Sequence, residues 1–192
     1  MADETSFDLT LERIALIRRM VVAWDATASG APIIHPDAPY GSEDRDGDIG
    51  NVTGDDDGAA QEHRALGDGL AVFVQNAVLK PGRYQYHNTL AKLRSSAVSD
   101  VFLDEATGET PEHITFEVTD EHLRLVRRLN VGWHEAHDVP SVDARRPYGE
   151  TDPVDPARHH EMQPALQIVL RYADLGPGPF RRAAGAPVWE PA

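Results

Sequence analysis

The sequence predicts a mainly α protein, with short strands as a minor α+β component, made of two copies of one unit packed with pseudo-twofold symmetry. Three observations lead to this prediction. A stretch near the N-terminus recurs in the second half of the chain, a Pro-Tyr-Gly turn follows each occurrence of it, and an apolar helical segment follows each turn. Recurrence in a fixed order indicates an internal tandem duplication. Each copy is therefore expected to run helix, PYG loop, helix.

The repeat is clearest in two blocks. Residues 7–24 (FDLTLERIALIRRMVVAW) and 116–133 (FEVTDEHLRLVRRLNVGW) are identical at eight of eighteen positions, whereas roughly one identity is expected by chance from ordinary composition. Residues 69–84 (GLAVFVQNAVLKPGRY) match residues 165–180 (ALQIVLRYADLGPGPF). The offset between the copies falls from 108 at the PYG turn to 96 in this second block, so the first copy contains twelve additional residues.

The first helix of each copy is predicted to begin after a threonine, because Thr10 and Thr119 each precede an apolar helical pattern and suit the N-cap position. In the first copy the apolar residues are spaced three and four apart as far as Trp24. This spacing predicts a helix that continues to Trp24, and to Trp133 in the second copy. Both tryptophans are expected in the core.

The PYG turns, at 39–41 and 147–149, combine a proline that fixes φ with a glycine that can take positive φ. Beyond them, the sequence predicts second helices at about 61–79 and 158–175, each closed by Pro-Gly. The alternating segment GRYQYH at 82–87 predicts a short strand.

These elements divide the chain into a first copy at 1–87, with an acidic insertion at about 43–57, an acidic linker at 88–112 and a second copy at 113–192. A unit of about 80 residues with two main helices is small for a core of its own. One compact body, in which the copies pack as in a fused dimer, is therefore the preferred interpretation over two separate beads.

The net charge of −14 is unevenly distributed along the 192 residues. Residues 43–57 carry seven acids and one arginine, and residues 100–121 carry eight acids and no lysine or arginine. The remainder of the chain is therefore balanced. Because these segments would repel a phosphate backbone, we expect no direct binding of nucleic acid.

Composition also argues against further classes of protein. The sequence contains no apolar run long enough for a membrane span, and its acidic N-terminus does not resemble a signal peptide. It contains no cysteine, which favours a reducing compartment, and the bias toward Ala, Asp, Arg, Gly and Pro is typical of a GC-rich bacterial source. We therefore expect a cytoplasmic bacterial protein with no cofactor, and homo-oligomerisation remains open.

The PYG turns and their flanks are the predicted binding residues. An exposed tyrosine on a tight turn suits contact with a protein partner, although a tyrosine folded back over its own copy, as packing, explains its duplication more simply. The repeated arginine pairs 18–19 and 127–128 complement a helix C-terminus, with an ion pair to Glu43 or Glu150, or an anion site, as alternatives. The predicted binding set is Tyr40, Gly41, Arg145, Arg146, Tyr148, Gly149 and Glu150.

The second copy also holds a histidine cluster that the first copy lacks. If the helix continued past Trp133, His134 and His137 would lie on one face at a spacing that can hold a metal. The alternative metal site is His134, His137, Asp138, His159 and His160.

Two functions follow from these patterns. The preferred one is a non-enzymatic acidic protein that binds a basic protein partner, as an inhibitor, an immunity-like protein or an accessory factor, with its acidic segments steering association. The alternative is a metal-dependent enzyme that uses the histidine and aspartate site of the second copy.

Overall fold

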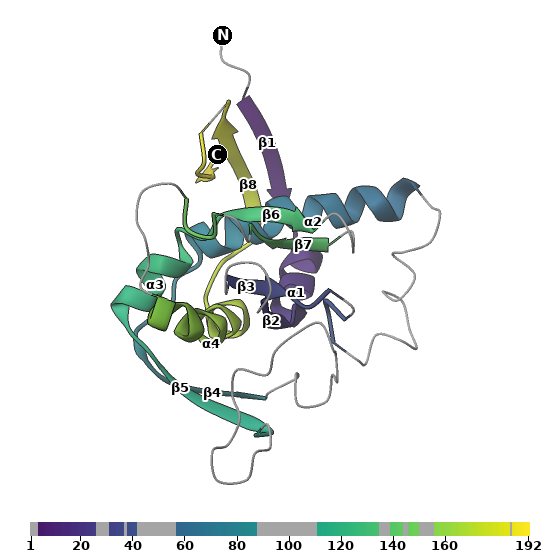
Figure 1. Cartoon of the computed structure of the whole chain (residues 1–192). Helices are drawn as coiled ribbons and strands as arrows, with labels where there is room; N and C mark the ends of the chain where they lie inside the picture. The colour runs from purple at the N-terminus through teal and green to yellow at the C-terminus, as the bar shows by residue number, and fades with distance from the viewer. Residues whose placement is uncertain are drawn as a thin grey trace.

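The protein is an α+β protein, as its computed structural model shows in Figure 1. The first copy contains β1 (Glu4–Leu9), α1 (Leu11–Arg19), β2 (Val22–Asp25), β3 (Ala31–Ile34), α2 (Asp57–Asn76) and β4 (Gly82–His87). The second contains β5 (His113–Val118), α3 (Asp120–Val126), β6 (Val131–His134), β7 (Val139–Val142), α4 (Pro156–Tyr172) and β8 (Gly178–Ala183), followed by β9 (Glu190–Pro191). The structure describes residues 4–25, 31–36, 38–41, 57–87, 111–134, 139–143, 146–149, 156–184 and 186–192.

The mainly α class predicted from the sequence is wrong, since small antiparallel sheets contribute as much of the described chain as its helices do. Each copy runs β-α-β-β-α-β rather than helix, loop, helix. The second helices and the strand at Gly82–His87 are confirmed. Most of the acidic insertion at 43–57 and of the linker at 88–112 lies outside the described residues.

The predicted helix starts are confirmed. The Thr10 side chain accepts a hydrogen bond from the backbone N–H of Arg13 at 3.2 Å, and Thr119 accepts one from His122 at the same distance. The imidazole Nδ1 of His122 in turn accepts from the Thr119 N–H at 3.1 Å, which completes a capping box. Each cap satisfies backbone donors that the first helical turn leaves without an intrahelical partner.

The predicted ends of these first helices are wrong. α1 stops at Arg19, Met20 takes an extended ψ of 135°, and Trp24 lies on strand β2. The spacing of apolar residues matches a helix, but Val21 and Val22 are β-branched and their backbone has partners elsewhere. The buried Gln167 side chain accepts from the Val22 N–H at 2.9 Å and donates to the Met20 carbonyl at 3.1 Å.

Each copy folds this stretch into a β-hairpin. β2 pairs antiparallel with β3, and β6 pairs antiparallel with β7. Trp24 lies opposite Pro32, and Trp133 lies opposite Pro140, so the registers of the two hairpins correspond. Trp24 is buried as expected, but Trp133 is only partly buried, against the surface of α2 at Gly67.

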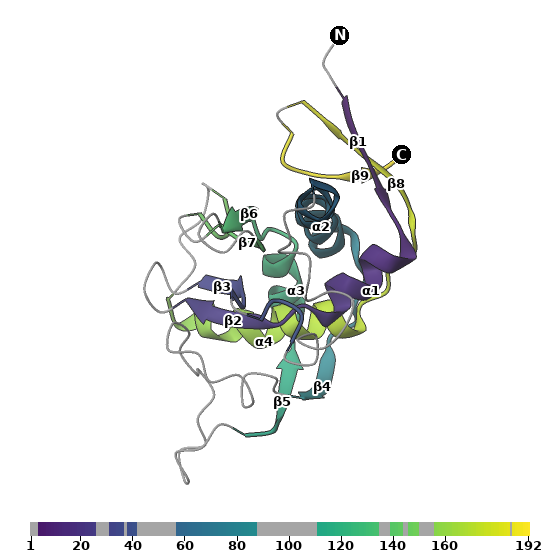
Figure 2. The same ribbon diagram turned by 90° about the vertical axis from the view of Figure 1, so that its right-hand side faces the viewer.

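The outer strands pair between the copies. β1 of the first copy pairs with β8 of the second, and β4 of the first pairs with β5 of the second. We call each of these strand pairs a ribbon. Phe7 lies opposite Phe180 in the β1–β8 ribbon, and Phe116 lies opposite Tyr84 in the β4–β5 ribbon. Phe7 and Phe116 occupy equivalent positions of the repeat, and so do Phe180 and Tyr84. Figures 1 and 2 show the two ribbons extending from opposite sides of the body.

The second helices also cross between the copies. α2 packs on the β6–β7 hairpin, and α4 packs on the β2–β3 hairpin, so each helix covers the hairpin of the other copy (Figure 2). One buried apolar cluster includes residues of both copies, among them Phe73 and Leu166. Each buried side chain of this kind stabilises the fold by about 1.5–3 kcal/mol relative to an exposed one.

The C-terminal segment folds back over one ribbon. Trp189 is fully buried, packs edge-on against Phe7 with ring centroids 5.9 Å apart, and lies under the guanidinium of Arg182. Its backbone N–H donates to the Gln75 side chain on α2 at 2.8 Å. None of the helices in the described ranges combines the length and the apolar character needed to cross a membrane.

Candidate functional site

The PYG turns are built the same way in both copies. Gly41 and Gly149 have φ of 99° and 82°, which confirms the predicted positive-φ glycines. The carbonyl of Pro39 accepts from the Val21 N–H at 2.8 Å, and that of Pro147 accepts from the Asn130 N–H at 2.8 Å. Each turn is thus fixed to the residue that precedes the hairpin of its own copy.

A side-chain acceptor also holds the start of each turn. His35 Nδ1 accepts from the Ala38 N–H at 3.1 Å, and at the equivalent place Asp143 accepts from the Arg146 N–H at 3.2 Å. The sequence did not single out His35 and Asp143, because the two side chains differ while their role as acceptors is shared. These contacts rigidify the turns.

The tyrosines of the turns are buried. Tyr40 and Tyr148 are 8% and 5% exposed, and burial raises the pKa of the Tyr148 phenol well above its usual range. Buried rings fit the packing role and offer no exposed aromatic surface to a partner. Of the other residues in the predicted binding set, Arg146 and Gly149 are exposed, Gly41 is partly buried, and Arg145 and Glu150 lie outside the described residues.

One arginine of each repeated pair, Arg18 and Arg128, makes a structural contact. The Arg18 guanidinium donates to the carbonyls of Arg171 and Ala173, both at 3.0 Å, and so satisfies acceptors at the C-terminal end of α4 in the other copy. Arg128 reaches the Tyr148 carbonyl at 3.4 Å. The predicted ion pairs with Glu43 or Glu150 fall on residues outside the described part of the chain.

The predicted histidine site is described only in part. His134 is the last residue of β6 and is half-buried, and His160 lies exposed on α4, stacked on Trp24 with ring centroids 4.7 Å apart. The helical spacing expected for His134 and His137 is wrong, because Trp133 and His134 lie on a strand. His137, Asp138 and the His159 side chain fall outside the described parts of the structure.

A different cluster of metal-ligating side chains lies at the end of the β4–β5 ribbon. His87 is the last residue of β4 and pairs with His113, the first residue of β5, and Glu112 precedes His113. One ligand atom from each of the three lies within 4.8 Å of the others, and all three side chains are exposed. The sequence analysis missed this cluster, although the predicted strand at 82–87 ends on one of its members.

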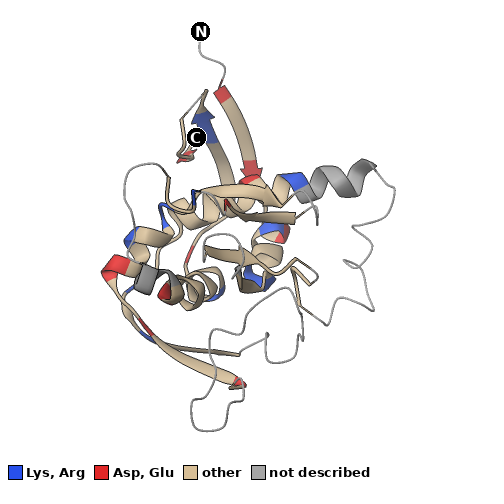
Figure 3. Ribbon diagram, in the orientation of Figure 1, with Lys and Arg blue, Asp and Glu red and all other residues tan. Residues whose placement is uncertain are grey.

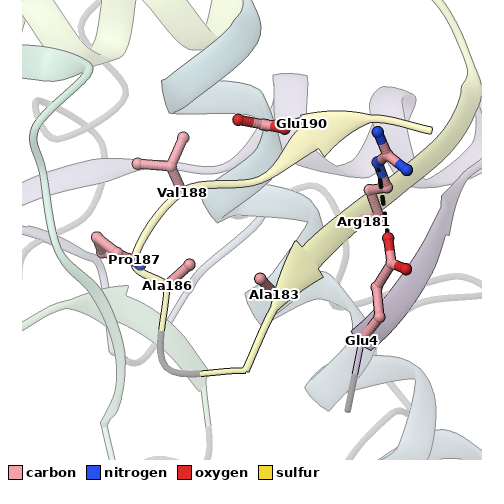
Figure 4. A pocket seen from close by; sticks show the side chains of 7 residues that line it. All are labelled: Glu4, Arg181, Ala183, Ala186, Pro187, Val188 and Glu190. Carbon is pink, nitrogen blue, oxygen red and sulfur yellow. Dashed lines mark ion pairs between the residues drawn. The ribbon is translucent and has the colours of Figure 1, made fainter. Parts of the chain in front are cut away.

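A pocket of about 510 Å³ lies between the β1–β8 ribbon and the C-terminal segment (Figure 4). Glu4 and Arg181 face each other along one side, with Nε and Oε1 3.6 Å apart and both side chains about half exposed. The opposite side carries the small or aliphatic side chains of Ala186, Pro187 and Val188. Because solvent screens this ion pair, it contributes little to stability, and the pocket presents no buried polar group to a ligand among its described lining residues.

Comparison with known proteins gives no match: no family model, no curated protein and no solved structure matches this chain.

Proposed function

We propose that the protein is a non-enzymatic acidic interaction protein that binds a basic protein partner, as an inhibitor, an immunity-like protein or an accessory factor. The observation that supports this proposal is that nearly all of the net charge lies outside the framework, by which we mean the described residues of the chain. The described residues include 15 acidic and 14 basic side chains, so −13 of the net charge of −14 belongs to the segments between and before them.

The framework itself favours neither sign of partner. Figure 3 shows acidic and basic residues interspersed over its helices and strands. Segments with uncompensated acids create a local negative potential, which raises the association rate of a basic protein and weakens as salt is added. The same potential repels the phosphates of nucleic acid. A basic protein surface is therefore the partner that this charge distribution favours.

We assign this function to the cytoplasm. The chain has no cysteine, which fits a protein kept in a reducing compartment.

The proposal is tested by neutralising acids in two different places. In one variant Asp44, Asp46, Asp48 and Asp55 become Asn, and in a matched control four exposed framework acids, Asp8, Glu117, Asp174 and Glu190, become the corresponding amides. Proteins captured from a lysate of the source organism are purified and titrated against the native chain and both variants over a series of salt concentrations.

The first variant is expected to bind the captured basic protein more weakly and with a smaller dependence on salt, whereas the framework variant stays close to the native chain. Equal effects of the two variants, or captured proteins that are acidic and bind independently of salt, would contradict the proposal.

A further inference from the structure

We propose that His87, Glu112 and His113 form a binding site for a divalent transition-metal ion of the zinc class, at the end of the β4–β5 ribbon. This inference does not rest on the proposed function, because it is argued from the positions of three described residues, of which Glu112 is also the last residue of the acidic linker.

The register of the ribbon brings the three residues together. His87 and His113 are direct cross-strand partners, and their rings lie on the same face with centroids 5.2 Å apart and an interplanar angle of 35°. The ligand atoms of the cluster lie within 4.8 Å of one another. Tetrahedral zinc with bonds of about 2.0–2.1 Å needs donor atoms roughly 3.3 Å apart, which exposed side chains reach by small rotations.

A hydrogen bond sets the tautomer of one of the imidazoles in a way that suits this role. Nδ1 of His87 lies 2.9 Å from the backbone carbonyl oxygen of Glu112. A carbonyl oxygen only accepts hydrogen bonds, so Nδ1 carries the proton and donates it, which leaves Nε2 with a free lone pair. Metal-binding histidines are typically held in this way, by a hydrogen bond from the other ring nitrogen to a carbonyl or carboxylate.

The donor set indicates the class of ion. Two imidazole nitrogens and one carboxylate suit Zn²⁺, Ni²⁺ and Cu²⁺, whereas Ca²⁺ and Mg²⁺ prefer sites made of oxygen ligands alone. Three protein ligands on an exposed ribbon leave coordination positions open to water or to a further ligand.

The other ribbon provides an internal comparison. At the positions equivalent to His113 and His87, it carries Glu4 and Ala183, which are also cross-strand partners. The two ribbons share their strand pairing but not these ligands. An ion bound here would therefore link β4, the last strand of the first copy, to β5, the first strand of the second copy. The other ribbon has no equivalent link among its described residues.

The test uses the full chain without a polyhistidine tag, titrated with ZnCl₂ by calorimetry. We expect one equivalent of Zn²⁺ to bind, with ring signals of His87 and His113 shifting in proton–nitrogen NMR spectra. His87→Ala, which copies the equivalent residue of the other ribbon, and His113→Ala should each weaken binding by at least about tenfold.

His160→Ala is the matched control, because His160 is also exposed but lies on α4, stacked on Trp24, and is not a member of the cluster. It should leave Zn²⁺ affinity unchanged. The proposal is overturned if Zn²⁺ does not saturate at one equivalent, if His87→Ala binds as tightly as the native chain, or if His160→Ala is the variant that removes binding. Native-like circular dichroism of each variant separates loss of the site from loss of the fold.

Discussion

Val78 and Asp174 donate their backbone N–H groups to each other's carbonyl oxygens, at 2.9 Å in both directions. The two residues occupy the same position of the repeat, 96 residues apart. A position that pairs with its own counterpart lies where two equivalent units meet in a twofold arrangement. A side chain in one copy can therefore be compared with the side chain at the equivalent position of the other copy, as we do for Arg18 and Arg127.

Replacing Arg18 with Ala should destabilise the protein by about 2 kcal/mol, because two carbonyls at the end of α4 lose a charged donor. Arg127 is the equivalent residue, is exposed, and makes no side-chain hydrogen bond within the described structure. Arg127→Ala should change the free energy of unfolding by no more than about 0.5 kcal/mol. Urea unfolding of both variants measures the difference, and equal losses would contradict this account of Arg18.

Replacing Gln167 with Leu, a side chain of similar volume, should strongly destabilise the protein. The Gln167 amide is 4% exposed and binds the Val22 N–H and the Met20 carbonyl, so leucine would leave two buried backbone groups without partners. The expected cost is about 2–4 kcal/mol. The same change at Gln85, whose side chain is exposed, should cost about 0.5 kcal/mol or less. A small effect at Gln167 in denaturant unfolding would show that the hairpin does not depend on this amide.

Gly149→Ala tests the PYG turn. The position has open space for a Cβ, but its φ of +82° is strained for alanine, so we expect a loss of about 1–2 kcal/mol. A Cβ added at Gly176 would also meet no atom within 4 Å, and Gly176 lacks a positive φ, which makes Gly176→Ala the control. That control should be neutral or stabilise by up to about 1 kcal/mol. Thermal melting measures the stability of both variants. An unchanged melting temperature for Gly149→Ala would show that the positive φ of this position carries no cost for alanine.

Stability should fall at alkaline pH. Burial raises the pKa of the Tyr86 and Tyr148 phenols above their usual range, so the unfolded chain releases these protons first as pH rises past about 10. The folded state then binds more protons than the unfolded state, and each group costs up to about 1.4 kcal/mol per pH unit. Tyr86→Phe should show a shallower loss in urea unfolding between about pH 9 and 11. An unchanged slope would argue against titration of this phenol.

The sequence predicted those features of the fold that local chemistry determines. The caps at Thr10 and Thr119, the positive-φ glycines of the PYG turns and the two long helices all follow from neighbours a few residues away. The strands were missed where the deciding contact is distant. Val22 leaves the helix because Gln167 holds its backbone, and β1 is a strand because β8 pairs with it. Apolar spacing alone does not contain either contact.

The candidate metal site was missed for the same reason. His87 and His113 are far apart in the sequence, and only the β4–β5 register makes them neighbours. The metal site predicted from the sequence instead used histidines that are neighbours in the sequence, His134 with His137 and His159 with His160.

The exchange of outer strands also has a consequence for biosynthesis. β1 lies at residues 4–9, yet its partner β8 lies at residues 178–183. Because synthesis runs from β1 to β8, the edge of β1 stays unpaired while residues 10–177 are made. Closing this ribbon is therefore expected to be a slow folding step, during which the exposed edge of β1 favours binding by chaperones.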